Sequence, residues 1–423
     1  MDYPAGGGYK ALLFADANFL AHVSRLLEIG KVLRDEYGYE VKFAAHGPYA
    51  RLLRDCDFEV DYVYTVPKDT TLELAKRASL MDPIWWYKTV MRSVRSDVEA
   101  IRRNKPDVVL GDMHWTARAA ATECRVPYVS IVNGAWTKYL DHRLRALDDH
   151  FLTSILGAKT AERTLPFFKK QMLAFVAFPY RMWQKRGDHD VNVDTLYEIL
   201  EGDLTLMADI PEFCPTRDLP ENVQYIGPIL WNAPMPEPEF LKRLDPKRPT
   251  VYVSMGSTGK KAFFEASLAA FADTEYQVVM TTGEIALAHA KAPANFFITD
   301  FAPGLAIMKR ADLVVNHGGN GTIYQALTAG IPIVGIPTHV DQQLQLQLCE
   351  RWGVGRKLRE KTFSAEILRR TVDEVVGNYL FRINAERMAQ SIAQYNGPRL
   401  AARAIEEFLR ARVPRRVPLR IAS

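Results

Sequence analysis

The sequence has little of what marks a secreted, metal-binding or membrane-spanning protein. Its 423 residues include four scattered cysteines and no Cys-x-x-Cys pair, which argues against a zinc site and for a reducing compartment. No uninterrupted apolar run approaches the roughly 20 residues that span a bilayer. The N-terminus, Met-Asp-Tyr-Pro-Ala-Gly-Gly-Gly, contains neither a basic nor an apolar region, so we expect no signal peptide and a cytoplasmic protein.

A large excess of charge is also absent. The 54 lysines and arginines and 50 aspartates and glutamates leave a formal net charge of +4, which gives no electrostatic footprint for nucleic acid. Hydrophobic residues make up 48% and charged residues 25% of the chain, as in ordinary soluble globular proteins. The length predicts two or three domains.

One stretch, residues 312–337, combines the elements of a buried βαβ unit. Leu313–Val315 is a short β-branched apolar run, and residues 332–337 form a second one. Between them, apolar residues recur at helical spacing from Ile323 to Leu327, and Gly330 lies where a helix would end. Two parallel strands joined by a crossover helix are typical of a sheet that is buried on both faces.

The turn between this strand and helix, His317–Thr322, contains three glycines. Such a turn leaves backbone N–H groups free at a helix N-terminus, with few side chains in the way, so it suits a phosphate. Ligands of open parallel sheets lie beyond the carboxyl ends of the strands, where this turn is predicted. Glycines often serve the geometry of a turn alone, but here Asp341 and Gln342 also follow just past the next strand.

This combination resembles the donor-sugar signature of the inverting UDP-glycosyltransferase superfamily, which includes plant, animal and macrolide-modifying bacterial enzymes. The shared features are a His, a Gly pair, a Ser or Thr that opens a helix, and an Asp/Glu-Gln pair after a proline-flanked strand. The resemblance implies that the turn holds the diphosphate of a nucleotide sugar and that Asp341 and Gln342 accept hydroxyls of the sugar. The implied donor-binding residues of this stretch are His317, Gly319, Asn320, Gly321, Thr322, Gln325, Asp341 and Gln342.

Gln325 departs from the family, in which a Glu three residues after the Ser or Thr accepts hydrogen bonds from both ribose hydroxyls. An amide offers one acceptor oxygen and an NH₂ donor, and its bond is weaker than that of a carboxylate. One hypothesis is that the protein tolerates or prefers a dTDP-sugar, whose deoxyribose keeps only the 3′ hydroxyl. The other, favoured by the similar shape of the two groups, is that Gln325 serves a UDP-sugar with one bond.

The first half of the chain also alternates strand and helix patterns. His22 follows the first predicted strand, in the loop expected to open the first helix, and Asp112 ends the fourth strand. Both would lie at the carboxyl edge of one parallel sheet, where they could approach each other. Apolar runs predict strands at residues 10–16, 41–45, 60–64, 107–112, 128–132, 204–207 and 223–226.

His22 and Asp112 match the family's catalytic pair by position. In the family, a His within Gly-His-x-x-Pro of the first loop is the general base, and an Asp after a later strand holds it. Here Ala21 replaces the Gly and Arg25 replaces the Pro. The resemblance implies that His22 takes the proton of an acceptor hydroxyl, and that Asp112 fixes its tautomer and stabilises the imidazolium. A lone His or Asp is more often structural, so these roles depend on the resemblance.

In the second half, two further features bear on the donor. Ser257 follows a β-rich run and is a candidate phosphate contact, although a plain strand-to-helix turn explains it equally well. Phe301-Ala302-Pro303 resembles the family's Trp-Val-Pro, at which the nucleotide base stacks. Phe301 keeps an aromatic face, but Gly304 replaces the usual Gln.

Two βαβ-rich halves predict the α/β architecture known as GT-B, in which two Rossmann-like domains with parallel sheets face each other across an interdomain cleft. The link between the halves carries five prolines and is expected to be semi-stiff and exposed. The predicted parts are an acceptor-binding domain at 1–230, the link at 231–249, a nucleotide-sugar-binding domain at 250–395, and a C-terminal helix packing back on the first domain with a basic tail at 396–423.

Residues 68–103 and 136–190 mix aromatic with basic side chains. The simplest interpretation is amphipathic helices packed on the sheet, with Lys and Arg reaching to solvent. The alternatives are an acceptor pocket for an apolar molecule, which the family places in this part of the chain, or a face that touches a membrane. The Arg-rich tail after Arg410 has little apolar periodicity and is expected to be frayed.

The resemblance implies an inverting O-glycosyltransferase that moves a sugar from a UDP- or dTDP-linked donor to a hydroxyl of an apolar small molecule. No cofactor or metal is expected, because the donor stretch has no evident Asp-x-Asp motif and a helix N-terminus can stabilise the leaving diphosphate. Three alternatives stay open: a membrane-surface enzyme that glycosylates a lipid, a non-catalytic nucleotide-sugar-binding partner protein, and a sugar-nucleotide epimerase. His22 with Asp112 speaks against the second, and Asp341-Gln342 with His22 against the third.

Overall fold

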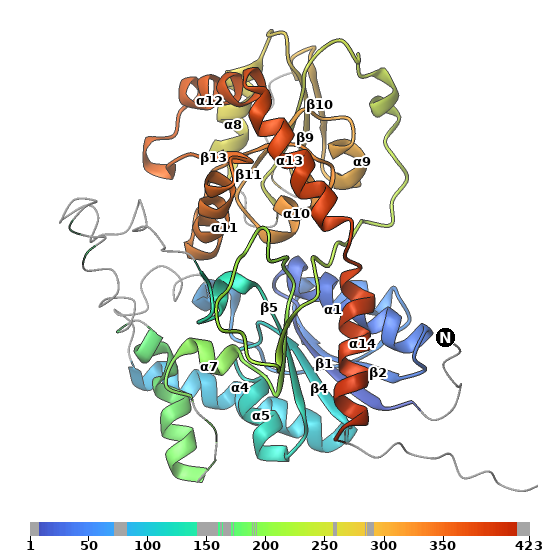
Figure 1. Ribbon diagram of the computed structural model, residues 1–423, viewed down its shortest axis with the longest axis vertical. Coiled ribbons are helices and arrows are strands. Elements are labelled where there is room, and N and C mark those ends of the chain that lie inside the picture. The colour runs from blue at the N-terminus through green and yellow to red at the C-terminus, as the bar shows by residue number, and fades with distance from the viewer. Residues whose placement is uncertain are drawn as a thin grey trace, which may run out of the picture.

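Two α/β units, one above the other in Figure 1, make up the computed structural model. Each unit is built on a parallel sheet, of seven strands in the first and six in the second, which confirms the predicted class of two Rossmann-like domains. The structure describes residues 8–71, 83–141, 160, 163, 171, 173–187, 189, 191, 193–256, 260–283, 285 and 292–412.

The first sheet has the strand order β3-β2-β1-β4-β5-β6-β7. Its strands are β1 (Lys10–Asp16), β2 (Glu40–His46), β3 (Glu59–Asp61), β4 (Val108–Asp112), β5 (Tyr128–Val132), β6 (Leu204–Met207) and β7 (Val223–Tyr225). β3 is shorter than the predicted 60–64, because the backbone N–H of Tyr64 donates to Ser96 Oγ at 2.8 Å instead of to a neighbouring strand.

Parallel pairing brings the ends of these strands into line. Asp112 lies opposite Ile131 of β5, and Val132 lies opposite Met207 of β6. The residues that follow β1, β4, β5 and β6 therefore lie along one side of the sheet, which we call the first carboxyl edge.

Both faces of the first sheet are covered by helices. On β1, Leu13 packs into the core beneath α1 (Leu20–Asp35), whereas Leu12 and Phe14 pack into the core beneath α4 (Pro83–Asn104), as the alternation of side chains along a strand requires. The other short helices of this unit are η1 (Pro48–Ala50), α2 (Arg51–Arg54), α5 (Ala117–Cys124), η3 (Gly134–Trp136) and α7 (Leu196–Leu200).

Several aromatic residues of the basic-aromatic stretches belong to this core. Trp86, Tyr180 and Trp183 are buried, and the Trp86 indole donates to the carbonyl of Val176 at 3.3 Å. The interpretation as helices packed on the sheet is confirmed for these three residues. The Phe167–Lys170 part of that prediction lies outside the described residues.

The second sheet has the order β10-β9-β8-β11-β12-β13. Its strands are β8 (Thr250–Ser254), β9 (Gln277–Thr281), β10 (Phe296–Thr299), β11 (Leu313–Asn316), β12 (Ile333–Gly335) and β13 (Gly355–Lys357). The helices of this unit are α8 (Lys261–Phe271), α9 (Gly304–Met308), α10 (Asn320–Thr328), α11 (Val340–Arg351), η6 (Glu360–Thr362), α12 (Ala365–Gly377) and α13 (Tyr379–Ile392). Asn316 lies between Ser254 and Gly335 at the ends of their strands. The turns after these strands form a second carboxyl edge.

The proline-rich link is not simply an exposed spacer. It contains the short helix η4 (Glu239–Arg243), whose Leu241 is buried in the core of the second unit. The ring of Phe240 also stacks on Phe297, with 5.6 Å between the centroids. The expectation of an exposed link is therefore wrong at these positions, because apolar residues between the prolines pack on the second sheet's unit.

The last helix, α14 (Gly397–Arg410), leaves the second unit and lies along α1 of the first (Figure 1). Its apolar stripe, which includes Ile405 and Leu409, joins the core beneath α1. The Tyr39 hydroxyl donates to Glu406 Oε2 at 2.6 Å. The basic tail beyond Arg412 lies outside the described residues.

Candidate active site

His22 and Asp112 meet at the first carboxyl edge. His22 is the third residue of α1, within the first helical turn rather than in a preceding loop as predicted, because the helix begins at Leu20. Its Nδ1 lies 2.7 Å from Asp112 Oδ1, and the Asp112 side chain is fully buried while that of His22 is 22% exposed. A carboxylate only accepts, so Nδ1 carries the proton and Nε2 keeps a free lone pair.

Two further titratable groups face this pair. Asp16, at the end of β1, has a pKa raised by burial, against the opposing effects of His22 and of hydrogen bonds from Asn18. His114, two residues after Asp112, has a pKa lowered to about 4 by burial and by nearby His22. His114 is therefore neutral at pH 7, and the local charges come from the carboxylates and from a buried arginine.

That arginine is Arg25, which the sequence showed only as a departure from the family. It is buried, and its Nη2 donates to Asp112 Oδ1 at 2.5 Å. Its Nη1 donates to Asn133 Oδ1, also at 2.5 Å. The available signal was its spacing: Arg25 follows His22 by three residues, so the two lie on the same side of one helix.

At the second carboxyl edge, the turn between β11 and α10 encloses a neutral histidine. The pKa of His317 is lowered to about 3, first by burial and then by His339. A Cβ atom at Gly256 would lie 2.5 Å from His317 Cε1, and one at Gly319 would lie 2.6 Å from Nε2. The glycines of the turn thus allow the backbone to close on the imidazole.

Several polar atoms of this turn are buried without a hydrogen-bond partner. They are His317 Nδ1, Asn316 Nδ2 and Asn320 Nδ2. The helix α10 begins here with Gly319 at its N-cap and without a side-chain cap, which leaves backbone donors for an incoming group. Unsatisfied buried polar groups are rare in native proteins, so their concentration in one turn fits a ligand that accepts hydrogen bonds.

The predicted sugar-binding pair lies in the first turn of α11. Asp341 Oδ1 accepts a hydrogen bond at 2.6 Å from the indole of Trp136, which belongs to the first unit. Gln342 is buried, and its Oε1 accepts from the backbone N–H and the hydroxyl of Thr338 at 2.8 and 3.0 Å. Asp341 is thus held between the two units, while the oxygen of Gln342 supports the loop before α11.

The remaining predicted donor residues lie near the same edge. Phe301 is 54% exposed and precedes α9, with Ala302 beside it. Gln325 donates from Nε2 to the carbonyl of Trp231, in the link, at 2.8 Å. A Glu could not donate to this carbonyl, which explains the departure from the family physically. Ser257 lies outside the described residues.

A second cross-domain contact joins the two edges. Asp209, which follows β6, accepts from the hydroxyl of Tyr324 of α10 at 2.7 Å and from the backbone N–H of Gly134 at 2.5 Å. Burial raises the pKa of Asp209 to about 6. Asp209, Tyr324 and Trp136 were not predicted from the sequence, because their contacts form between segments far apart in the chain.

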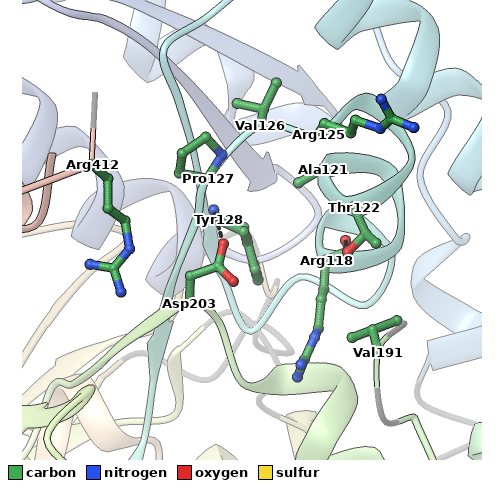
Figure 2. Close-up of a pocket in the computed structure, with 10 residues that line it drawn as sticks. All are labelled: Arg118, Ala121, Thr122, Arg125, Val126, Pro127, Tyr128, Val191, Asp203 and Arg412. Atoms are coloured by element: carbon green, nitrogen blue, oxygen red, sulfur yellow. Dashed lines mark hydrogen bonds between the residues drawn. The ribbon is translucent and has the colours of Figure 1, made fainter. Parts of the chain in front are cut away.

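A cavity of about 560 Å³ lies away from these residues, at the amino ends of β5 and β6 (Figure 2). Arg118, Arg125 and Arg412 surround it, together with Asp203, which accepts from the backbone N–H of Tyr128 at 2.8 Å. Since it lies at the opposite end of the strands from Asp112, it is not part of the candidate active site.

Neither a metal centre nor a membrane span is visible in the described residues. Within them, no group of three or more His, Cys, Asp or Glu side chains is arranged to hold a metal ion. No helix in this part of the chain has the length and apolar character needed to cross a membrane.

Comparison with known proteins identifies the family. Residues 265–408 match the family model described as Erythromycin biosynthesis protein CIII-like, C-terminal domain. Over 92% of this chain and 90% of the relative, the sequence is 31% identical to a PGL/p-HBAD biosynthesis glycosyltransferase of Mycobacterium tuberculosis (strain ATCC 25177 / H37Ra). The chain belongs to the UDP-glycosyltransferase superfamily. This glycosyltransferase is also 30% identical, over 91% of its length and 84% of the relative, to a PGL/p-HBAD biosynthesis rhamnosyltransferase of Mycobacterium bovis (strain BCG / Pasteur 1173P2).

Solved structures share the architecture of the enzyme. CalG4, the calicheamicin glycosyltransferase, superposes with a TM-score of 0.72 over 96% of this chain and 100% of that chain, at 21% identity. The glycosyltransferase VinC in complex with dTDP gives a TM-score of 0.66 over 95% and 98%, at 18% identity. At such identities the likeness concerns the fold.

Proposed function

We propose that this glycosyltransferase is an inverting O-glycosyltransferase, with His22 as the general base and a nucleotide-diphospho-sugar as donor. The observation that carries the proposal is the placement of two complementary sites. The His22–Asp112 pair lies on one carboxyl edge and the uncapped glycine turn lies on the other. The hydrogen bonds of Asp209 and Asp341 hold these two edges together.

In the proposed reaction, His22 Nε2 removes the proton from an acceptor hydroxyl. The oxygen attacks the anomeric carbon from the face opposite the diphosphate, so a glycosidic C–O bond forms while the bond to the phosphate oxygen breaks. The electron pair of that bond leaves with the nucleoside diphosphate, and the anomeric configuration is inverted. Asp112 stabilises the imidazolium, because its buried carboxylate lies 2.7 Å from Nδ1.

The leaving diphosphate develops negative charge at the β11–α10 turn. The N-terminus of α10 places partial positive charge and free N–H groups there, and the neutral His317 adds a polar group with an unpartnered nitrogen. We propose that Thr322 and the amides of Gly319–Gly321 complete this site. Transfer is expected to need neither a metal nor a cofactor, and to persist in excess EDTA.

The donor nucleotide is UDP or dTDP under this proposal. Gln325 keeps its Oε1 for a ribose hydroxyl while its Nε2 is held by Trp231, and the exposed face of Phe301 suits a base. Competition between UDP- and dTDP-linked forms of one sugar separates the two hypotheses for Gln325. If the UDP form wins by a large factor and Gln325→Glu does not widen the gap, Gln325 does not select the donor.

For the acceptor, we propose an apolar molecule with a free hydroxyl. It is either a lipid reached at a membrane surface or a small molecule in solution, and an experiment can distinguish the two. Both relatives are named for PGL/p-HBAD biosynthesis, and PGL is a glycolipid, which favours a lipid acceptor reached at a membrane surface. Ile84 and Trp85 at the start of α4 are 64% and 43% exposed, and basic residues follow them along the helix. Sedimentation with anionic vesicles that is lost in high salt would support peripheral contact. A small-molecule acceptor predicts no sedimentation.

The decisive experiment is a panel of nucleotide sugars and acceptors, read by mass spectrometry, with the anomer of the product assigned by NMR. The panel should contain UDP-glucose, dTDP-rhamnose, 4-nitrophenol and hydroxylated lipids. We expect a glycoside of inverted configuration, with and without EDTA. A donor converted to its epimer without transfer would support the epimerase instead, and binding without turnover would support a non-catalytic protein. Retention of configuration would refute the inverting mechanism.

A further inference from the structure

Arg25 shares the same carboxylate oxygen with the proposed base. Both Arg25 Nη2 and His22 Nδ1 lie within hydrogen-bond distance of Asp112 Oδ1, at 2.5 and 2.7 Å. The other arm of the guanidinium donates to Asn133, just after β5. Arg25 therefore joins the ends of two neighbouring strands to the helix that carries His22.

Charge balance gives this contact a role in the reaction. A fully buried carboxylate is costly unless a positive group compensates it, and neutral His22 supplies no charge before proton transfer. An arginine stays positive at any pH at which an enzyme works. The guanidinium thus compensates the charge of the buried Asp112 carboxylate even when the imidazole of His22 carries none, as a general base requires.

We propose that Arg25 is a positioning residue of the transfer reaction. Its guanidinium fixes the Asp112 carboxylate against His22 and Asn133, and its charge limits the pull of Asp112 on a proton at His22. The inference rests on the proposed function, in which His22 is the base. It adds a residue at the position where the family has a proline, which can neither donate nor carry charge.

The surroundings support an electrostatic rather than a purely structural role. From β1, Asp16 faces His22, and from the loop after β4, His114 does so in its neutral form. From the loop after β6, Asp209 interacts with Arg25. Arg25 is thus a buried cation among several acids, and its removal changes the balance of charge around His22.

The test compares Arg25→Met, Arg25→Gln and Arg25→Lys with the wild type. The kcat/KM for transfer to a hydroxylated lipid of the panel, whose alcohol group stays protonated throughout the range, is measured from pH 5 to 9, with whichever of UDP-glucose and dTDP-rhamnose the wild type uses. Without the cation, Asp112 attracts a proton to His22 more strongly, so His22 is protonated at higher pH. For the Met and Gln variants we expect the acid limb of the profile to move up by about one pH unit, a tenfold loss of activity on that limb.

Arg25→Lys separates charge from geometry. One ammonium keeps the charge but cannot reproduce the planar fork, so we expect the acid limb near its wild-type position and a lower turnover at every pH. Arg34→Met is the matched control, because Arg34 lies on α1 but pairs with Asp35 and the carbonyl of Cys56. It should leave the profile unchanged.

Nucleotide affinity and thermal unfolding are measured on the same preparations. If Arg25→Met does not fold, Arg25→Gln, which keeps a donor for Asp112 without the charge, takes its place. An unmoved acid limb in the uncharged variants, or a Lys variant that shifts like the Met variant, would overturn the proposal. His22→Ala distinguishes a failure of the proposed function from a failure of the role proposed for Arg25. If His22→Ala keeps full activity, the proposed function is wrong. If His22→Ala is inactive but the acid limb of Arg25→Met does not move, only the role of Arg25 is wrong.

Discussion

The two carboxyl edges of this enzyme lie close together, but their chemistry differs. On the first edge, ionisable side chains bind one another: His22 and Arg25 both contact Asp112 Oδ1, and Tyr324 reaches across to Asp209, although Arg25 Nε and Asp112 Oδ2 are buried without partners. On the second edge, the β11–α10 turn is built from glycine, amide and a neutral histidine, and several of its buried polar atoms lack partners.

The difference follows from what each edge is proposed to do. A base must have a fixed orientation and a balanced charge, which requires side chains that bind one another. A diphosphate brings its own charge and needs free donors and room for its oxygens, so partners within the protein would compete with it. Catalysis and donor binding should therefore be separable by mutation.

The largest expected effect comes from the first edge alone. His22→Ala should lower transfer by roughly 100-fold or more, the scale of a positioned general base, because no other group takes the acceptor proton. Asp112→Asn should act in the same direction but less strongly. Turnover and nucleotide affinity are measured together, with Lys31→Ala on the same helix as control. Wild-type turnover in the His22 variant would end the assignment, and a large loss of nucleotide affinity would show that the edges are not separable.

A change on the second edge should give the reverse pattern. In Gly319→Val, the added side chain starts 2.6 Å from His317 Nε2, so the turn must shift. We expect affinity for the free nucleoside diphosphate to fall by about tenfold, the cost of roughly one to two lost hydrogen bonds. Gly377→Ala, where a Cβ meets no atom within 4 Å, is the control, and calorimetry is the measurement. Unchanged affinity would place the diphosphate elsewhere.

Trp136 links the two edges, and its substitution should separate binding of the donor's sugar from binding of its nucleoside diphosphate. Trp136→Phe removes the N–H that donates to Asp341 Oδ1 at 2.6 Å but keeps an aromatic ring. We expect the KM of the nucleotide sugar to rise by a few-fold, as for one lost hydrogen bond, because Asp341 is less well oriented toward the sugar. The affinity for the free nucleoside diphosphate, which lacks the sugar, should not change. If the nucleotide sugar and the free nucleoside diphosphate lose binding equally, Trp136 does not orient Asp341 toward the sugar but only holds the two domains together.

The smallest differences should appear in stability as the pH falls. The pKa values of His114 and His317 are lowered by burial to about 4 and about 3, so between those values and about 6.5 the unfolded chain binds more protons. The two histidines therefore make their full contribution to the free energy of unfolding above about pH 6.5, and this contribution is lost as the pH falls. For Asp209, with its pKa raised to about 6, the folded state binds the extra proton, so stability rises as the pH falls through 6.

Urea denaturation at pH 7 and pH 5 measures this balance. From the two histidines and Asp209 alone we expect the free energy of unfolding to fall by roughly 2 kcal/mol. Burial also raises the pKa values of Asp97 and Asp16, which act in the same direction as Asp209. Asp209→Asn removes the opposing contribution, so its stability should fall more steeply than that of the wild type. An Asp209→Asn variant whose stability falls no more steeply than that of the wild type would contradict the raised pKa of Asp209.

Local sequence patterns were enough to predict most of the strands, the glycine turn and the architecture. Short apolar β-branched runs, helical spacing and turn glycines are local signals, and they placed β1, β5 and β6 at the residues where the structure has them. The same local signals placed His22 and Asp112 after strands of one parallel sheet. Because such strands end at one edge, the two residues were expected to meet before their 2.7 Å contact was seen.

The contacts that these residues make depend on how the helices and sheets pack in three dimensions. In the sequence, Arg25 is only a departure from the family's pattern, and its bonds to Asp112 and Asn133 depend on how α1 packs against the ends of β4 and β5. The contacts of Trp136 with Asp341 and of Tyr324 with Asp209 span 205 and 115 residues of chain. No local propensity encodes a distance between segments that far apart, because it is set by how the two sheets and their helices pack as whole bodies.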